Sequence, residues 1–294
     1  MKKSMPISLV SVCDNHYIKL LAALIKSIEH NYKGSDKIYY YVIEDHVSKK
    51  NKRKLEGSVN GDIIQIRWVE MQKSIPDNIQ LPADGTTYPM NVYMRLFIPN
   101  FISKEVTKVI YLDVDMIVQE DISVLWNTEL GDHVVAAAGD PFIKTVADFG
   151  GIENYGDFGL DAKTRYFNSG LLIINIQKWL DFNVAENVIN CIITNKRFVK
   201  FADQYGLNVV LADKWKELDT LWNFHAEFQA SAPYLIHFSG RKPIFRSYKN
   251  NEDYRLIFYS YLQKTQWQNH KPIGETTRYM KKILNIIQKV RFSS

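Results

Sequence analysis

Short apolar runs alternate with amphipathic stretches along most of the chain. The runs at 7–13, 37–45, 62–70, 106–112, 133–140, 169–175 and 234–238 are rich in Ile, Val, Leu and Tyr, which is typical of strands. Four stretches have the spacing or polarity of helices, namely 18–30, 48–57, 203–213 and a stretch from Ile176 into "NVIN". This alternation predicts an α/β sandwich around a mostly parallel sheet.

The pattern of strands and helices continues without a break that would indicate a domain boundary until near the end of the chain. We find no internal repeat, low-complexity segment or linker before about residue 263. We therefore expect one catalytic domain over residues 1–262 and a separate tail over 263–294.

Composition and cysteine usage narrow the class of protein. The chain has 294 residues, 46% hydrophobic and 23% charged, which is ordinary for a soluble globular protein. Cys13 and Cys191 stand far apart, which argues against a disulfide framework or a zinc site. Asp14 interrupts the first apolar run before a secretory segment could form, and no run approaches the roughly 20 apolar residues of a spanning helix. We expect a cytoplasmic protein.

The positive charge is concentrated at one end. Residues 271–294 hold six basic residues and one acidic residue, which accounts for the whole net charge of +5. The other 270 residues balance at 31 basic and 31 acidic. A neutral body argues against a broad nucleic-acid surface.

The stretch "YLDVDMIVQED" (111–121) places two carboxylates at the end of an apolar run. Side chains at i and i+2 of an extended chain point the same way, so Asp113 and Asp115 can converge on one cation. Carboxylate oxygens suit hard divalent cations, and an added imidazole would favour Mn²⁺ over Mg²⁺. The alternative without a cation is that the two carboxylates simply face solvent at the end of a strand. A haloacid-dehalogenase-like phosphatase, with Asp113 as nucleophile, is the chemical alternative, although its motif normally opens the domain.

Polar residues end several other predicted strands. Asp14, Asp140 and His237 each follow an apolar run, and ligands of open α/β sheets bind at the carboxyl ends of the strands. Each residue alone could be a turn or a cap. No Gly-x-Gly-x-x-Gly follows the first strand, so a dinucleotide site is not supported. Instead, Asp14 could accept from the imide N–H of uracil and Tyr17 could stack on the base.

Six stretches in order resemble glycosyltransferase family 8, a group with the GT-A fold that contains bacterial lipopolysaccharide α-glycosyltransferases and glycogenin. They are "DNHY" (14–17), "YMRL" (93–96), "VIYLDVDMIVQEDISVLWNTELGD" (109–132), "YFNSGLLIIN" (166–175), "DQYGLN" (203–208) and "HFSGRKP" (237–243). The resemblance implies transfer of a hexose from a UDP-sugar with retention of anomeric configuration.

The same resemblance implies a role for each matching residue. It makes Asp113, Asp115 and His237 the metal ligands, with Mn²⁺ the expected ion and Mg²⁺ the alternative. It assigns the donor nucleotide and sugar to Val12, Asp14, Tyr17, Arg95, Asp113, Val114, Asp115, Asn168, Ser169, Gly240 and Lys242. It places Asp140, Asp203 and Gln204 around the reacting hexose as the catalytic group.

The chemistry of these residue types agrees with such roles. A cation beside Lys242 would stabilise the charge that develops on a departing diphosphate. Retention normally suggests a carboxylate nucleophile, yet the residue expected at the reacting face is an amide, Gln204. We therefore favour same-face attack, in which a donor phosphate oxygen takes the acceptor's proton, over double displacement through Asp203. The expected substrates are UDP-glucose or UDP-galactose and a glycan of the cell envelope, and no nucleic acid partner is expected. A catalytically inactive nucleotide-sugar-binding protein is the remaining hypothesis.

The tail carries a separate pattern. Met280, Ile283, Leu284, Ile287 and Val290 fall on one helical stripe, with lysines and arginines off it. A basic amphipathic helix suits the surface of an anionic bilayer, which predicts peripheral membrane association through residues 275–294. The alternative is a helix that docks its stripe on the catalytic domain.

Overall fold

This computed structural model describes residues 6–76, 79–82 and 90–274. The predicted membrane-binding segment 275–294 lies outside the described residues and stays a prediction. The strands are β1 (Ile7–Asp14), β2 (Ile38–Asp45), β3 (Ile64–Glu70), β4 (Lys108–Leu112), β5 (Met116–Val118), β6 (Val135–Ala138), β7 (Leu171–Asn175), β8 (Trp215–Leu218), β9 (Phe224–His225) and β10 (Leu235–His237). The α-helices are α1 (Ile18–Asn31), α2 (Lys49–Glu56), α3 (Met71–Ser74), α4 (Ile122–Trp126), α5 (Ile176–Asp181), α6 (Val184–Thr194), α7 (Ala202–Val210) and α8 (Glu252–Leu262). The 3₁₀ helices are η1 (Met90–Asn100), η2 (Tyr155–Phe158), η3 (Lys196–Phe198) and η4 (Thr220–Asn223).

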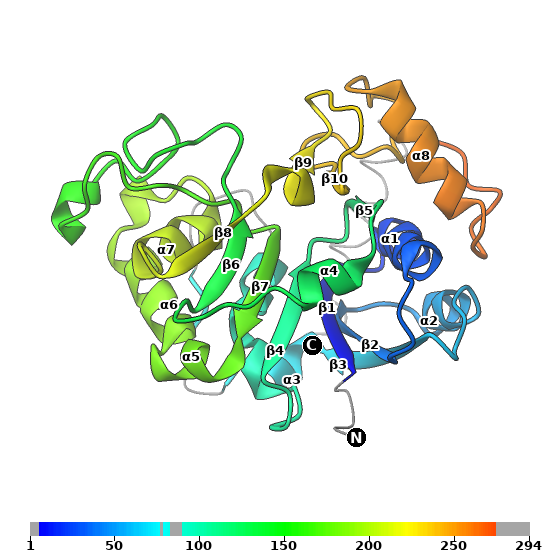
Figure 1. Cartoon of the computed structure of the whole chain (residues 1–294), viewed down its shortest axis with the longest axis horizontal. Helices are drawn as coiled ribbons and strands as arrows, with labels where there is room; N and C mark the ends of the chain where they lie inside the picture. Colours follow the sequence, from blue (N-terminus) through cyan, green and yellow to red (C-terminus); the bar gives the residue numbers. More distant parts are fainter. Residues whose placement is uncertain (1–5, 77–78, 83–89, 275–294) are drawn as a thin grey trace, which may run out of the picture.

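A seven-stranded sheet runs through the molecule in the order β3-β2-β1-β4-β7-β6-β8 (Figure 1). Every neighbouring pair is parallel except the two pairs that β7 makes with β4 and β6. Because β7 runs the opposite way, its amino end lies at the same edge of the sheet as the carboxyl ends of β4 and β6. The residues just before β7 therefore reach the edge where ligands bind in sheets of this kind.

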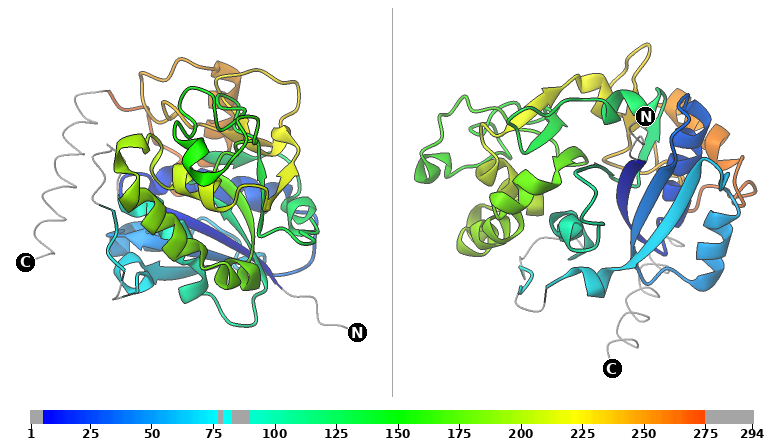
Figure 2. Two further views of the ribbon diagram at one scale, coloured as in Figure 1. Left: turned by 90° about the vertical axis from the view of Figure 1, so that its left-hand side faces the viewer. Right: turned by 60° about the horizontal axis from the view of Figure 1, so that its bottom comes forward.

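Alternate residues of the central strands enter two different cores. Ile110 and Leu112 of β4 pack in one core and Val109 and Tyr111 in the other, because successive side chains of a strand point to opposite faces. Helices α1 and α8 cover the first face and lie side by side in Figures 1 and 2. Helices α5, α6 and α7, together with η1, cover the second face. The result is a three-layer sandwich with an apolar core on each side of the sheet.

A second, three-stranded sheet, β5-β10-β9, stands at the carboxyl edge of the large one. The chain leaves β4 at Leu112 and enters β5 at Met116, so only three residues separate the two sheets. These residues are Asp113, Val114 and Asp115. The carboxylate pair therefore occupies the junction between the sheets.

All seven predicted strands are present, and the long helix predicted from Ile176 forms as two helices. Between α5 and α6 stands Asn183, whose φ of 45° is incompatible with a continuing right-handed helix. Helix α2 begins after Ser48, whose side chain accepts an N–H from Asn51, and ends at Gly57 as its sequence predicts. Strands β5, β8 and β9 and helices α3, α4 and α8 were not predicted.

The residues that follow α8 pack back onto the body. Trp267 and Thr265 are buried, and the N–H of Gln266 donates to the hydroxyl of Ser58 at 2.9 Å. Whether a separate tail begins after Leu262 stays a prediction. Among the described residues, no helix combines the length and the apolar character needed to cross a membrane.

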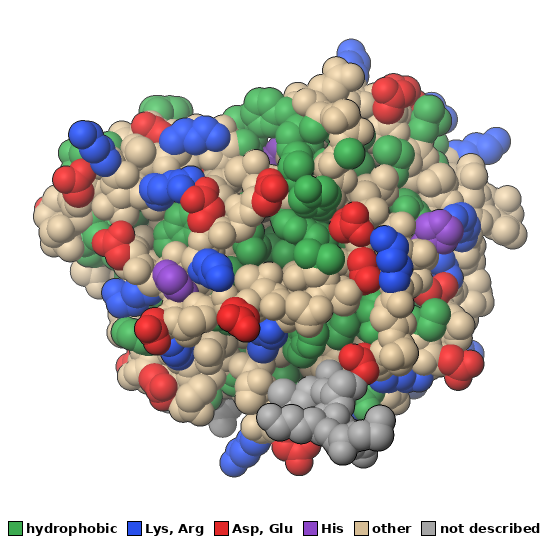
Figure 3. Space-filling model, in the orientation of Figure 1, with side chains coloured by type: hydrophobic (Ala, Val, Ile, Leu, Met, Phe, Trp, Pro, Cys, Tyr) green, Lys and Arg blue, Asp and Glu red, His purple; other side chains and the backbone are tan. Residues whose placement is uncertain are grey.

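The surface carries both signs of charge. On the face drawn in Figure 3, lysine and arginine side chains are interspersed with aspartate and glutamate, and hydrophobic side chains gather in the upper middle. This mixture agrees with the balanced charge of the first 270 residues.

Candidate active site and metal centre

The backbone on both sides of the carboxylate pair is held by strands of different sheets. The N–H of Asp113 donates to the carbonyl of Gly170, just before β7, at 2.8 Å. The carbonyl of Asp115 accepts from the N–H of Phe238, just after β10, at 2.9 Å. Both carboxylates are thereby fixed at the sheet junction.

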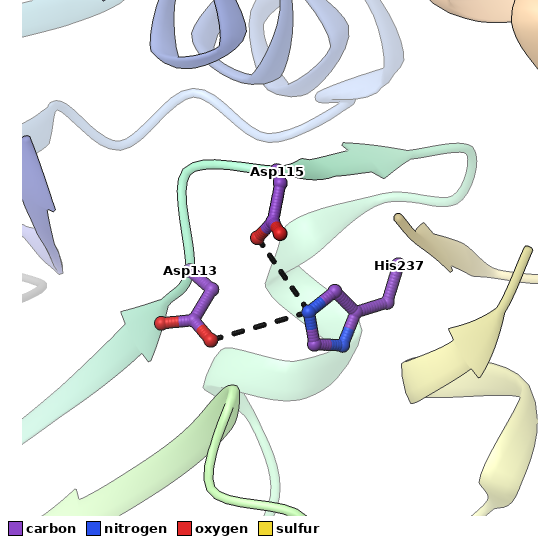
Figure 4. A group of neighbouring side chains, drawn as sticks. All are labelled: Asp113, Asp115 and His237. Atoms are coloured by element: carbon purple, nitrogen blue, oxygen red, sulfur yellow. Dashed lines mark ion pairs between the residues drawn. The ribbon is translucent and has the colours of Figure 1, made fainter. Parts of the chain in front are cut away.

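The register of the small sheet brings His237 to this pair. Strand β10 runs antiparallel to β5, and His237 lies opposite Met116, the residue after Asp115. Figure 4 shows its ring facing both carboxylates, with Nε2 4.0 Å from Asp113 Oδ2 and 3.5 Å from Asp115 Oδ1. These distances exceed those of good hydrogen bonds.

Hydrogen bonds behind His237 determine which ring nitrogen carries the proton. Oδ2 of Asp140 accepts an N–H from the amide of Asn168 at 3.0 Å, which turns the amide oxygen of Asn168 the other way. The amide oxygen of Asn168 then accepts from Asn223 Nδ2 at 2.9 Å and from the N–H of Gly170 at 3.0 Å. Asn223 is left presenting its oxygen, 2.8 Å from His237 Nδ1. Nδ1 therefore carries a proton, and Nε2 is the ring nitrogen that faces the carboxylates.

This set of donors fits a divalent cation. One ligand atom from each of Asp113, Asp115 and His237 lies within 4.8 Å of the other two. Mg²⁺ prefers oxygen ligands alone, whereas Mn²⁺ also accepts an imidazole nitrogen, so this mixed set suits Mn²⁺ better. Gly170 keeps the space open: a Cβ there would stand 2.7 Å from His237 Cε1 and 3.0 Å from Asp113 Oδ2.

Lys242 adds a positive charge on the other side of Asp115. Its ammonium contacts Asp115 Oδ2 and also donates to the carbonyls of Phe238 and Ser239, at 2.7 and 2.9 Å. Burial alone would raise the pKa of Asp115, but the charge of Lys242 and its contact with the carboxylate outweigh that effect and hold the pKa well below its usual range. Asp115 is therefore ionised at neutral pH.

Arg95 on η1 binds the opposite side of the site. Its guanidinium is buried, contacts Asp113 Oδ1 at 3.2 Å and Asp203 Oδ2 at 2.9 Å, and donates to the carbonyl of Ser169. It also lies over the ring of Tyr111, whose hydroxyl donates to Asp113 Oδ1 at 2.7 Å. These contacts leave Asp113 Oδ2 as the oxygen that faces His237.

Asp203 is a buried carboxyl in the first turn of α7. Burial raises its pKa to about 6, because the charge of Arg95 offsets only part of the cost of desolvation and Asp113 adds repulsion. The preceding residue, Ala202, has a φ of 41°, a conformation that is uncommon outside glycine. Such backbone outliers gather at functional sites.

The neighbouring Gln204 is held at both ends of its amide group. Its Oε1 accepts from the N–H of Ser169 at 3.0 Å, and its Nε2 donates to Asp140 Oδ2 at 3.2 Å. Asp140 in turn accepts from the N–H groups of Phe142 and Ile143 through Oδ1. The amide therefore has one fixed orientation beside Asn168.

Two pockets meet at the carboxylate pair. The larger, about 650 Å³, is lined by predicted residues that include Asp140, Asn168, Ser169, Asp203, Gln204, His237 and Gly240. The smaller, about 190 Å³, is lined by Val12, Asp14, Tyr17 and Val114. Arg95, Asp113, Asp115 and Lys242 line both. Every residue predicted from the sequence thus lies in one of two adjoining pockets, although the role of each stays a prediction.

Asp14 also has a structural task in the smaller pocket. Its Oδ1 accepts from the N–H groups of His16 and Tyr17, each at 2.8 Å, and so fixes the turn that leads into α1. The ring of Tyr17 packs edge-on against His16, with centroids 4.8 Å apart. The turn places both predicted base-binding side chains beside β1.

Three residues that shape the candidate metal centre were not predicted from the sequence, namely Tyr111, Gly170 and Asn223. Tyr111 stands two residues before Asp113 and shares its face of β4, so the strand period could have indicated it. Asn223 on η4 gave no signal, because only the pairing of β10 with β5 and β9 brings it to His237.

The sequence model of the family described as glycosyl transferase family 8 matches residues 8–246, and the chain belongs to this family. It is therefore a transferase with the predicted GT-A sandwich. The galactosyltransferase LgtC, solved with donor and acceptor sugar analogs, has the same fold with a TM-score of 0.73 and 22% identity, over 88% of this chain and 96% of that chain.

Curated relatives share about a quarter of their residues with this chain. General stress protein A of Bacillus subtilis is 27% identical over 91% of this chain and 96% of its own length. Glycosyltransferase GlyB of Streptococcus pneumoniae is 27% identical over 80% of this chain. The chain spans little more than half of GlyB, with 57% of its length covered.

Replacing Gly170 tests the fit of the metal centre. In Gly170→Ala the new methyl group would press on His237 and Asp113, so we expect Mn²⁺ affinity to fall by about tenfold or more. Calorimetric titration of the folded protein with Mn²⁺ measures this. The matched control is Gly139→Ala, where the nearest atom, Arg165 Nη2, is 3.5 Å from the new Cβ. Equal affinities for the two variants would contradict the assignment.

Proposed function

We propose that the protein is a retaining, metal-dependent glycosyltransferase that moves a hexose, glucose or galactose, from UDP to a glycan acceptor of the cell envelope. The observation that carries the proposal is the meeting of two pockets at Asp113 and Asp115. A nucleotide in the smaller pocket and a hexose in the larger one would have the diphosphate between them at the carboxylate pair.

The charge of the site supports a cation there. Four carboxylates, those of Asp113, Asp115, Asp140 and Asp203, and two cations, Arg95 and Lys242, line the larger pocket and are buried or half-buried. The formal charges of these six side chains sum to −2. A diphosphate adds further negative charge, and a low-dielectric cleft tolerates such an excess only when it is neutralised. One divalent cation balances the protein groups.

The residues would divide the work as follows. Asp113, Asp115 and His237 would hold Mn²⁺, which as a Lewis acid stabilises the charge of a departing diphosphate. Asp14 and Tyr17 would bind the uracil base. Three further groups are already held in place by hydrogen bonds before a substrate arrives, namely Arg95, Asn168 and Gln204. Groups preorganised in this way require little rearrangement during the reaction.

The fixed amide of Gln204 supports same-face attack. An amide is a poor nucleophile, and both of its ends are engaged by Ser169 and Asp140. Gln204 would orient the hexose while a donor phosphate oxygen accepts the proton of the attacking acceptor hydroxyl. Asp203 is the alternative nucleophile, but its Oδ2 lies 2.9 Å from the guanidinium of Arg95.

Removal of the carboxylates tests the metal requirement. Asp113→Ala and Asp115→Ala should each lower UDP release from UDP-glucose and UDP-galactose by at least about a hundredfold, because each change removes a charged ligand. A chelator should silence the unaltered protein and Mn²⁺ should restore it. Circular dichroism provides the control for folding. Undiminished turnover in the chelator would refute the proposed chemistry. The unaltered protein should release no phosphate from an aryl phosphate; such release, abolished in Asp113→Asn, would establish the phosphatase alternative instead.

The stereochemical course tests the role of Gln204. Gln204→Ala should slow transfer by tens-fold or more, without any sugar becoming attached to the protein, and product NMR should show an α-linkage from the α-linked donor. A β-linked product would overturn the assignment of retention. A hexose found on Asp203 by mass spectrometry would favour double displacement. Donor binding with no turnover on any acceptor or on water would identify a binding protein.

A further inference from the structure

Exposed phenylalanines surround the mouth of the larger pocket. The part of the chain that the structure describes has five phenylalanines among its exposed large hydrophobic residues, and Phe142, Phe149 and Phe201 line this pocket. A fourth, Phe228, packs against Phe142 with ring centroids 5.3 Å apart. The fifth, Phe182, is not among the pocket's lining residues. Exposed apolar groups gathered in this way usually mark a binding surface.

Three separate segments contribute these rings. Phe142 and Phe149 lie between β6 and β7, Phe201 immediately precedes α7, and Phe228 follows β9. Phe149 is 94% exposed and Phe142 58% exposed, so neither side chain is needed for the core. Hydrophobic side chains gather in the upper middle of the face drawn in Figure 3.

The backbone holds this rim close to the reacting groups. The N–H of Phe142 donates to Asp140 Oδ1 at 2.9 Å, and Asp140 also binds Gln204 through Oδ2. Next to Phe149, Gly150 has a φ of 90°, and a Cβ there would stand 3.2 Å from Phe201. The polar floor and the apolar rim are therefore continuous parts of one pocket.

We propose that this rim binds an apolar group attached to the acceptor, so that the acceptor is an amphiphile whose sugar end enters the polar floor. The inference rests on the proposed function. The four exposed rings of the rim offer no hydrogen-bond donor or acceptor, so they suit an apolar group better than the hydroxyls of a sugar. An alkyl chain leaving the sugar would bury that surface, and each buried methylene would add to affinity.

Matched glycosides separate the apolar contribution from the sugar. The test is a calorimetric titration of the full chain with methyl and octyl glycosides of glucose, galactose and lactose. All glycosides are kept below their micelle-forming concentrations, and each titration is run with and without UDP and Mn²⁺. We expect octyl glycosides to bind about tenfold or more tightly than methyl glycosides of the same sugar. Phe149→Ala/Phe228→Ala should remove most of that ratio by weakening the octyl glycosides alone. Phe182→Ala, an exposed phenylalanine away from the pocket, is the matched control.

Each other outcome decides against the amphiphile. Equal affinity for methyl and octyl glycosides would overturn the proposal, and so would a double variant that loses both equally, because the rings would then stack on sugar. Loss of binding to phosphatidylcholine vesicles by the double variant, with no octyl preference in the unaltered protein, would instead indicate a membrane-docking rim. An octyl preference that persists when neither UDP nor Mn²⁺ binds would uphold the apolar rim while the proposed glycosyl transfer fails.

Discussion

The concentration of negative charge at the junction of the two sheets is the constraint on which the rest of the site depends. Asp113 and Asp115 are separated by one residue and held by backbone hydrogen bonds to different sheets, so neither can move away from the other. Arg95 and Lys242 each approach one of them. These two cations leave the pocket with a net negative charge, which a divalent cation held by the carboxylates and by Nε2 of His237 would neutralise.

The orientation of that imidazole depends on a chain of hydrogen bonds that also fixes the sugar side of the pocket. Asp140 accepts from both Asn168 and Gln204 through the same oxygen, and Asn168 passes the polarity on through Asn223 to His237. The groups expected to bind the metal and the groups expected to bind the hexose therefore share one set of contacts. A change at either end of this hydrogen-bond network would alter the other end, because each amide in it is held in one orientation as donor and acceptor.

The local pattern of the sequence predicted most of the fold, and ordered motifs predicted which side chains would gather. The strands of the large sheet are recognisable because each is a buried apolar run, and the residues at their ends share one edge for topological reasons. The four-residue strand β8 contains two charged residues, so its pattern was too weak. Asn223 and the phenylalanine rim depend on contacts between distant segments, which no local pattern reports. The reversed direction of β7, which brings Asn168 to the site, is likewise a property of the assembled sheet.

The central claim is that Asp113, Asp115 and His237 hold a divalent cation beside the diphosphate of a nucleotide. The most direct measurement is anomalous X-ray diffraction at the manganese edge from crystals soaked with Mn²⁺ and UDP. The account predicts one strong anomalous peak bounded by these three side chains, with the diphosphate of UDP against it. The account would be contradicted if UDP were bound in the cleft with no anomalous peak among the three residues. It would also be contradicted if the peak lay among other residues.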